Sequence, residues 1–262
     1  MDIQLETNKV HFGDCLVLMQ DIPDKSVDMI LCDLPYGTTK CKWDVVIPFE
    51  PLWKQYNRII KDNGIILLFG SEPFASTLRL SNLKMYKYDY YWNKKRGANF
   101  LFANKQPFKI IETISVFYKK QPTYNPQKRD NPLGAQTKHL HKNSAKISKN
   151  VKSIMGESWK ETEQNNGENY AGKNYEPDKL LPTCLVEFVK DTKRIHPTQK
   201  PLELYEYLIR THTNEGDLVL DNCAGSCTTA IACINTKRNW ICMENNQEYY
   251  NAGLQRINEH NN

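Results

Sequence analysis

The sequence predicts an α/β fold with a mostly parallel, Rossmann-like sheet. Two transitions from strand to loop predict it: the apolar run 27–32 leads into Asp33, and the segment 216–221, a turn followed by a buried strand, leads into a loop of small residues. A third observation is a pair of apolar strands, 86–92 and 111–118, that we expect to complete the sheet as an antiparallel hairpin. Near-continuous apolar runs are typical of strands buried on both faces, and ligands bind beyond the carboxyl ends of such strands.

Composition narrows the class of protein without identifying it. A chain of 262 residues suits one α/β domain with an insertion, and a formal net charge of +5 is too small to indicate a partner. No apolar run approaches the ~20 residues of a membrane-spanning helix, and the first residues do not resemble a signal sequence. The eight cysteines include no Cys-x-x-Cys pair. We therefore expect a cytoplasmic protein with reduced thiols, no metal site and no membrane contact.

The first half of the chain reads as helices alternating with strands. Apolar residues at helical spacing predict a helix over 49–60, which the turn residues Asp62-Asn63-Gly64 should end. A buried strand over 65–69 follows. Between the two hairpin strands lies the basic segment 93–100, which we expect to be a flexible loop at the same sheet edge as Asp33.

The segment Asp33-Leu34-Pro35-Tyr36 carries the clearest chemical signal. A carboxylate can accept a hydrogen bond from an amine, and an aromatic ring can stack on a planar base. Asp33 and Tyr36 therefore suit chemistry on an exocyclic amino group. Strand-end turns also contain Asp and Pro for backbone reasons alone, so this interpretation requires a cofactor site elsewhere in the chain.

The second half supplies a candidate for that cofactor site. The loop 222–229 leads into an apolar helix, and small residues let a ligand approach the backbone at a helix N-terminus. The next strand, 240–244, ends in Glu244, and an acid at this place can accept hydrogen bonds from ribose hydroxyls. A nicotinamide oxidoreductase is the competing interpretation, but the loop has the single glycine Gly225 and lacks Gly-x-Gly-x-x-Gly. A tight turn without a ligand would also carry small residues.

Together these segments resemble the DNA amino-methyltransferases, which methylate N6 of adenine or N4 of cytosine. Asp33-Leu34-Pro35-Tyr36 is similar to their Asp-Pro-Pro-Tyr motif, with Leu34 in place of the first proline. The resemblance implies that Asp33 and the Leu34 carbonyl accept the two amino hydrogens, and that Tyr36 stacks on a flipped base. The catalytic residues would be Asp33, Leu34, Pro35 and Tyr36.

The same resemblance implies S-adenosylmethionine as the cofactor. The loop 220–229 is similar to the family's Asp-Pro-Phe-x-Gly-Ser-Gly-Thr-Thr, but Asn222 and Cys223 replace Pro-Phe, and Cys227 replaces the second glycine. His196-Pro197-Thr198-Gln199-Lys200-Pro201 resembles the segment that closes over the methionine end, with Thr198 as helix N-cap. The implied cofactor residues are Asp14 (on the adenine amino group), Cys15, Asp33, His196, Pro197, Thr198, Lys200, Asp221, Asn222, Cys223, Ala224, Gly225, Ser226, Cys227, Thr228, Glu244 and Asn245.

The linear order of the motifs is that of the beta class of these enzymes, because the catalytic strand precedes the cofactor loop. This order implies a methyltransferase sheet of seven mostly parallel strands. The catalytic half would be 1–120 and the cofactor half 192–262. Between them, 121–191 is poor in apolar clusters and rich in Lys, Asn, Glu and Pro, so it would be an inserted target-recognition region or a disordered linker.

The resemblance implies double-stranded DNA as the substrate, with adenine N6 favoured over cytosine N4 because Asp33 occupies the first motif position. A DNA-binding module without catalysis and an RNA or protein methyltransferase remain alternatives. A homodimer, a cognate restriction endonuclease and a stand-alone role in a phage or mobile element are left open. Phosphate contacts are expected from the segment 93–100 and from the start of the insert, through Lys94, Lys95, Arg96, Asn99, Lys128 and Arg129.

Overall fold

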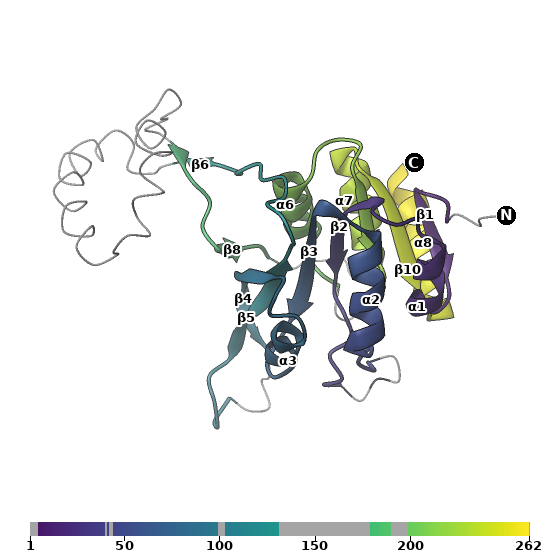
Figure 1. Ribbon diagram of the computed structural model, residues 1–262. Coiled ribbons are helices and arrows are strands. Elements are labelled where there is room, and N and C mark those ends of the chain that lie inside the picture. The colour runs from purple at the N-terminus through teal and green to yellow at the C-terminus, as the bar shows by residue number, and fades with distance from the viewer. Residues whose placement is uncertain are drawn as a thin grey trace. The chain divides into compact units, whose positions relative to one another are not determined.

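The computed structural model describes residues 5–39, 41, 44–98, 103–130, 179–189 and 199–261. The chain forms two compact units, the first made of 1–125 and 183–262, and the second of 126–182. The first unit contains the larger sheet and all the helices of the described residues (Figure 1). In the second unit, the described residues form the two-stranded antiparallel ladder of β6 (Arg129–Asp130) and β7 (Lys179–Leu180).

The first unit is built on an eight-stranded sheet with the order β1-β10-β9-β2-β3-β5-β4-β8. The strands are β1 (Lys9–Phe12), β2 (Val27–Cys32), β3 (Ile60–Gly70), β4 (Tyr86–Ala98), β5 (Lys109–Phe117), β8 (Leu185–Glu187), β9 (Leu218–Asp221) and β10 (Asn239–Glu244). Neighbours from β1 to β3 are parallel, β5 is antiparallel to both β3 and β4, and β8 returns parallel to β4.

The predicted α/β fold with a mostly parallel sheet and a hairpin is confirmed, but the sheet has eight strands instead of seven. The extra strand, β8, lies within 121–191, where the sequence predicted only the insert. Three residues with little apolar periodicity give no strand signal by themselves. The strand forms because the edge of β4 offers unpaired backbone groups, and Trp92 pairs in register with Val186.

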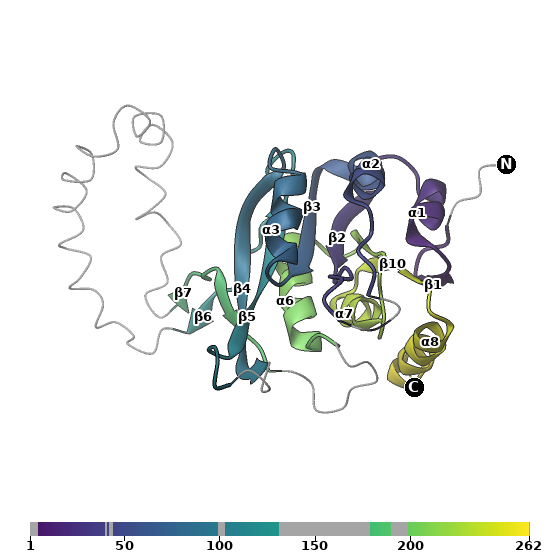
Figure 2. The same ribbon diagram turned by 90° about the horizontal axis from the view of Figure 1, so that it is seen from below.

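Helices cover both faces of this sheet (Figure 2). The face that carries Ile30 and Cys32 packs against α1, the 3-10 helix η1, α2 and α3, and the face that carries Met29 and Leu31 packs against α6, α7 and α8. The helices are α1 (Cys15–Leu18), η1 (Met19–Asp21), α2 (Phe49–Ile59), α3 (Phe74–Ser81), α6 (Leu202–His212), α7 (Thr228–Thr236) and α8 (Gln247–Asn261). Burial on both faces explains why β2 is almost continuously apolar.

Two boundaries differ from the sequence prediction. Helix α2 ends at Ile59, and Asp62-Asn63-Gly64 belongs to β3, because Ile60 already pairs with Val27 beside an irregularity in the β2–β3 register. Gly64 is required there, since a Cβ atom would lie 2.9 Å from the carbonyl oxygen of Asp28. The basic residues 94–96 lie in strand β4 instead of a flexible loop, because the β4–β5 ladder continues to Ala98 and Lys109.

The last residue of α6, His212, is buried against Tyr90 of the hairpin. Its side chain is 3% exposed, and its Nε2 lies 3.0 Å from the Tyr90 hydroxyl. Burial lowers the pKa of His212 from 6.5 to about 4, since the charged imidazolium would lose its hydration.

We expect this residue to make the fold sensitive to acid. Between pH 6.5 and 4 the unfolded chain binds a proton at His212 that the folded chain does not bind, so acid favours unfolding. The free energy of unfolding should fall across this window by up to about 3 kcal/mol from this residue alone. Urea denaturation at pH 7 and pH 5 measures it. His212→Gln should lose less stability than the wild type between these pH values, and an equal loss would contradict the assignment.

Candidate active site

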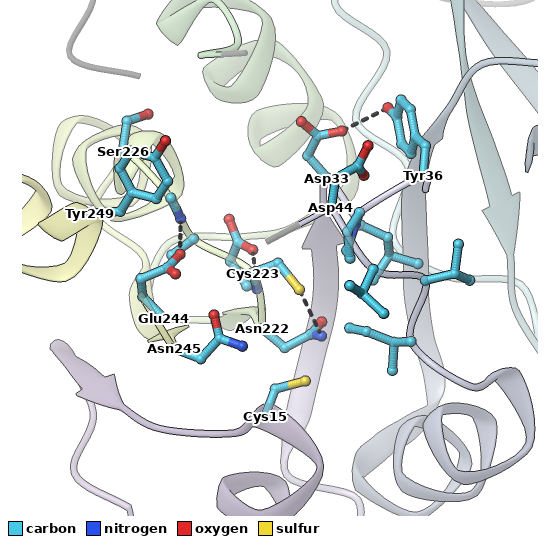
Figure 3. Close-up of a pocket in the computed structure, with 18 of the residues that line it drawn as sticks. Cys15, Asp33, Tyr36, Asp44, Asn222, Cys223, Ser226, Glu244, Asn245 and Tyr249 are labelled. Carbon is cyan, nitrogen blue, oxygen red and sulfur yellow. Dashed lines mark hydrogen bonds between the residues drawn. The ribbon is translucent and has the colours of Figure 1, made fainter. Parts of the chain in front are cut away.

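A cavity of about 500 Å³ opens at the carboxyl ends of β2, β9 and β10. Asp33 and Tyr36 lie at one side of it, and Glu244, Asn245 and Tyr249 lie at the other (Figure 3). The structure brings most of the predicted site residues to its lining: Asp14, Cys15, Asp33, Leu34, Pro35, Tyr36, Lys200, Asp221, Asn222, Cys223, Ala224, Gly225, Ser226, Thr228, Glu244 and Asn245. Two distant parts of the sequence therefore share one cavity, as the parallel sheet requires.

Asp33 follows directly after β2 and is held by two neighbours. The Tyr36 hydroxyl donates a hydrogen bond of 2.7 Å to Asp33 Oδ1, and Lys200 Nζ lies 2.9 Å from Oδ2. Burial raises the pKa of the Asp33 carboxyl, and the positive charge of Lys200 offsets this only in part. The Tyr36 ring stacks on Phe74 at 5.0 Å between centroids, so one of its faces is already covered.

Glu112 on β5 is a member of this cluster that the sequence did not indicate. Its Oε1 lies 2.5 Å from Lys200 Nζ and accepts a 3.1 Å hydrogen bond from the Tyr36 hydroxyl, while Lys94 lies 3.5 Å from Oε2. Burial opposes ionisation of Glu112, but Lys200 and Lys94 outweigh it and lower the pKa. Lys200, which the resemblance placed on the cofactor, is thus anchored between two carboxylates.

Asp44 is a second residue that sequence reasoning missed. It is 7% exposed, and its carboxylate accepts hydrogen bonds from the backbone amides of Gly37, Thr38 and Thr39 at 2.8, 2.9 and 2.6 Å. These bonds outweigh burial and lower its pKa. Asp44 therefore fixes the loop that follows Tyr36 and forms one wall of the cavity. The sequence offered one signal for this role, an acidic residue shortly after the turn at Gly37.

The loop after β9 is held by hydrogen bonds from both sides. Asp221 accepts from the Cys223 amide at 3.1 Å and from the Thr229 hydroxyl, and burial raises its pKa to about 6. Asn222 Oδ1 accepts a 2.5 Å bond from the hydroxyl of Tyr56 on α2. The replacement of proline by Asn222 is therefore matched by a polar partner inside the core.

Two acids predicted to contact the cofactor also organise the backbone around the cavity. Glu244 Oε2 accepts from the Gly225 amide and Oε1 from the Asn246 amide, both at 2.8 Å. Asp14 caps α1, where its Oδ1 accepts a 2.7 Å bond from the Leu16 amide. Both carboxylates line the cavity, and each oxygen retains lone pairs for further donors.

Cys227 lies elsewhere than predicted. Its backbone is in the left-handed region, with φ of 55°, which explains why the family has glycine at this position. Its side chain is fully buried against Gly253 of α8, and Cys227 is absent from the described lining of the cavity.

Four of the predicted residues, His196, Pro197, Thr198 and Asn99, lie outside the described residues. The expected N-cap of α6 is among them; within the described residues, Pro201 occupies that position. Among the predicted phosphate contacts, Lys94 is directed to Glu112, and Lys95 pairs with Glu187 at 2.5 Å. Arg96 is exposed on β4, and Lys128 and Arg129 are exposed in the second unit.

The family model described as DNA methylase matches residues 27–255. The chain belongs to this family of N6/N4 DNA amino-methyltransferases. It is 30% identical to the type II methyltransferase M1.MboII of Moraxella bovis over 94% of this chain and 95% of the relative. It is 26% identical to the DNA adenine methyltransferase YhdJ of Escherichia coli K12, over 96% of this chain and 83% of that protein.

Solved structures share the fold. The M1.HpyAVI–SAM complex matches with a TM-score of 0.59 at 22% identity, over 95% of this chain and 98% of that one. The cytosine-N4-specific PvuII DNA methyltransferase matches with a TM-score of 0.65 at 17% identity, over 98% and 88%. Across the described segments of this methyltransferase, every helix is too short or too polar to cross a membrane.

The contact between Cys227 and Gly253 generates a stability prediction. A Cβ atom at Gly253 would lie 2.5 Å from Cys227 Sγ, so Gly253→Ala should destabilise the protein by about 1–3 kcal/mol although alanine favours helices. Cys227→Gly removes the obstructing sulfur. The double variant should therefore be more stable than Gly253→Ala alone. Thermal unfolding of the four proteins measures this coupling, and additive effects would contradict it.

Proposed function

We propose that this protein transfers a methyl group from S-adenosylmethionine to N6 of a flipped-out adenine in double-stranded DNA. The observation that carries the proposal is the placement of Asp33 and Tyr36 in the same cavity as the loop 221–228 and Glu244. An amine acceptor and a cofactor cradle thereby share one space, as a direct transfer between two bound molecules requires.

The lining of the cavity fits S-adenosylmethionine by its charge. Carboxylates of Asp14, Asp33, Asp221 and Glu244 face it from three strand ends and one helix cap, which suits a ligand with a sulfonium and an ammonium group. We assign Asp14 as the acceptor for an adenine amine and Glu244 as the acceptor for ribose hydroxyls. The backbone at Gly225, with φ of 49°, leaves room for close approach.

S-adenosylmethionine would be held by Asp14, Asp221, Gly225 and Glu244 on the cofactor side of the cavity. It would supply an electrophilic methyl group to the amine nitrogen, and the electron pair of the carbon–sulfur bond would stay on the sulfur. Asp33 accepts a hydrogen bond from one hydrogen of the amine, and the Leu34 carbonyl accepts one from the other hydrogen. Together the two bonds direct the nitrogen lone pair toward the methyl carbon. Because burial raises the pKa of Asp33, its carboxylate is also suited to receive the proton that the methylated amine releases and to pass it to water.

Duplex DNA hides the amino group, so the base must leave the helix to reach Asp33. Tyr36 contributes its ring to the cavity wall, and stacking of a base on such a ring is worth roughly 1–3 kcal/mol. Adenine is favoured over cytosine by Asp33 in the first motif position, and the relative YhdJ is named a DNA adenine methyltransferase.

The decisive experiment expresses the protein in a bacterial host that lacks DNA methylation and maps modified bases by single-molecule sequencing. We expect N6-methyladenine in one defined sequence motif. N4-methylcytosine in a defined motif would support the mechanism but contradict adenine as the target base. The absence of any modification by folded protein would favour a DNA-binding module.

Asp33→Asn should lower methylation by at least about 100-fold, because the amide is a poorer acceptor and cannot take the proton. Binding of S-adenosylmethionine, measured by calorimetry, should persist, since the carboxylates of Asp14, Asp221 and Glu244 still line the cavity and Lys200 keeps Glu112 as a partner. Asp21→Asn, at an exposed carboxylate outside the cavity lining, is the matched control. Methylation by Asp33→Asn at the wild-type rate would refute the role of Asp33.

Two substitutions at Tyr36 separate its ring from its hydroxyl. Tyr36→Ala removes both and should lower turnover by about 10- to 100-fold, in line with loss of base stacking. Tyr36→Phe retains the ring and should keep most of the activity. Single-turnover assays on unmethylated DNA measure both, and equal activity of the two variants would argue against stacking.

A further inference from the structure

Glu112 is a buried carboxylate in the middle of a strand, a position that normally carries an apolar residue. Its side chain is 9% exposed, and it lies on β5, opposite Trp92 of β4. A buried charge is tolerated only when it is paired and hydrogen-bonded. Glu112 is paired with the same groups that hold Asp33, which suggests a task within the site beyond folding.

The first shared group is Lys200. Its ammonium lies 2.5 Å from Glu112 Oε1 and 2.9 Å from Asp33 Oδ2, so Glu112 takes the shorter of the two contacts. If Lys200 paired with Asp33 alone, its ammonium would compete with the target amine for hydrogen bonds to the Asp33 carboxylate. By sharing Lys200, Glu112 weakens this competition, while the cation still favours the ionised form of Asp33.

The second shared group is the Tyr36 hydroxyl. It has one proton to donate and two acceptors within reach, Asp33 Oδ1 at 2.7 Å and Glu112 Oε1 at 3.1 Å. Burial and the two neighbouring carboxylates raise the pKa of Tyr36, so the hydroxyl remains a donor. When an amine approaches Asp33 Oδ1, the hydroxyl can turn to Glu112 without losing its hydrogen bond.

We propose that Glu112 is a positioning residue that keeps Asp33 available to the target amine, by sharing Lys200 and by accepting the Tyr36 hydroxyl. This inference rests on the proposed function of Asp33. It requires no contact between Glu112 and the base.

The ionisation of Asp33 should report this arrangement, because charged groups approach it from several elements. Lys200 precedes α6 and Glu112 comes from β5, while Lys94 of β4 acts on Glu112. Tyr36 donates to Asp33 from its own loop. The remaining titratable groups that influence Asp33 or respond to it are Asp221 after β9, Cys32 of β2 and Tyr205 of α6.

The test is the pH dependence of kcat for methyl transfer to unmethylated DNA. Glu112→Gln removes a negative charge near Asp33 and leaves Lys200 to Asp33 alone. Its acid limb should move to lower pH by about one unit, while the plateau of kcat falls about 10-fold or more. Lys200→Gln should move the acid limb in the opposite direction, because it removes the cation that favours ionised Asp33.

Asp89→Asn is the matched control. Asp89 is a buried carboxylate of the same hairpin, 7% exposed, but its partners are Ser115, Tyr86 and Arg79, away from the cavity. This variant should leave the acid limb of the pH profile at its wild-type position. A merely structural role of Glu112 would make Glu112→Gln behave in the same way.

A second variant covers the case in which Glu112→Gln does not fold, as judged by circular dichroism and by binding of S-adenosylmethionine. Glu112→Asp retains the negative charge but moves it away from Tyr36 and Lys200. It should therefore move the acid limb of the pH profile to lower pH, by less than Glu112→Gln does. If the wild type is active and Asp33→Asn is not, an unshifted acid limb in a folded Glu112 variant would overturn this inference and leave the proposed function intact. Activity of Asp33→Asn would instead overturn the proposed function.

Discussion

The constraint on which this site depends is the cost of holding charges where water is excluded. Asp33 must lie at the end of a strand that is buried on both faces, because only such a strand brings it to the centre of the sheet edge. A carboxylate at that depth is destabilised unless cations and donors surround it. Lys200 and Tyr36 contact Asp33 directly, and Glu112 and Lys94 extend the cluster, which holds two carboxylates and two ammonium groups with Asp33 included.

The same constraint shapes the cofactor side of the cavity in another way. There the acids Asp221 and Glu244 are held by backbone amides and a hydroxyl. Amides tie these acids to the loop without neutralising them, so their negative charge still faces the cavity. The two halves of the site thus differ: ion pairs hold Asp33 in place, whereas hydrogen bonds hold the carboxylates that face a cationic ligand.

Local patterns predicted the parts of this arrangement that depend on neighbouring residues in the chain. Asp33, Tyr36 and the loop 221–228 were predicted because a buried strand and its following turn are contiguous in sequence. Glu112 could not be found in this way, since its role depends on the antiparallel pairing of β5 beside β3. Lys94 was predicted to contact DNA phosphates because a run of basic residues is typical of a solvent-exposed segment. Its pairing with Glu112 depends on the neighbouring strand β5, which the local sequence does not indicate.

Residues that depart from the family's motifs are held by contacts with other parts of the core. Two of the three replacing residues in the cofactor loop have a partner on a remote element: Asn222 accepts a hydrogen bond from the Tyr56 hydroxyl of α2, and Cys227 packs against Gly253 of α8. Leu34, in place of a proline, is 3% exposed and belongs to the apolar cluster shared with Trp53 and Phe74. A proline rigidifies a turn through its own ring, whereas Leu34 is held by packing. The geometry of the loop is therefore maintained from the core, and a substitution in α2 or α8 can reach the cavity without touching it.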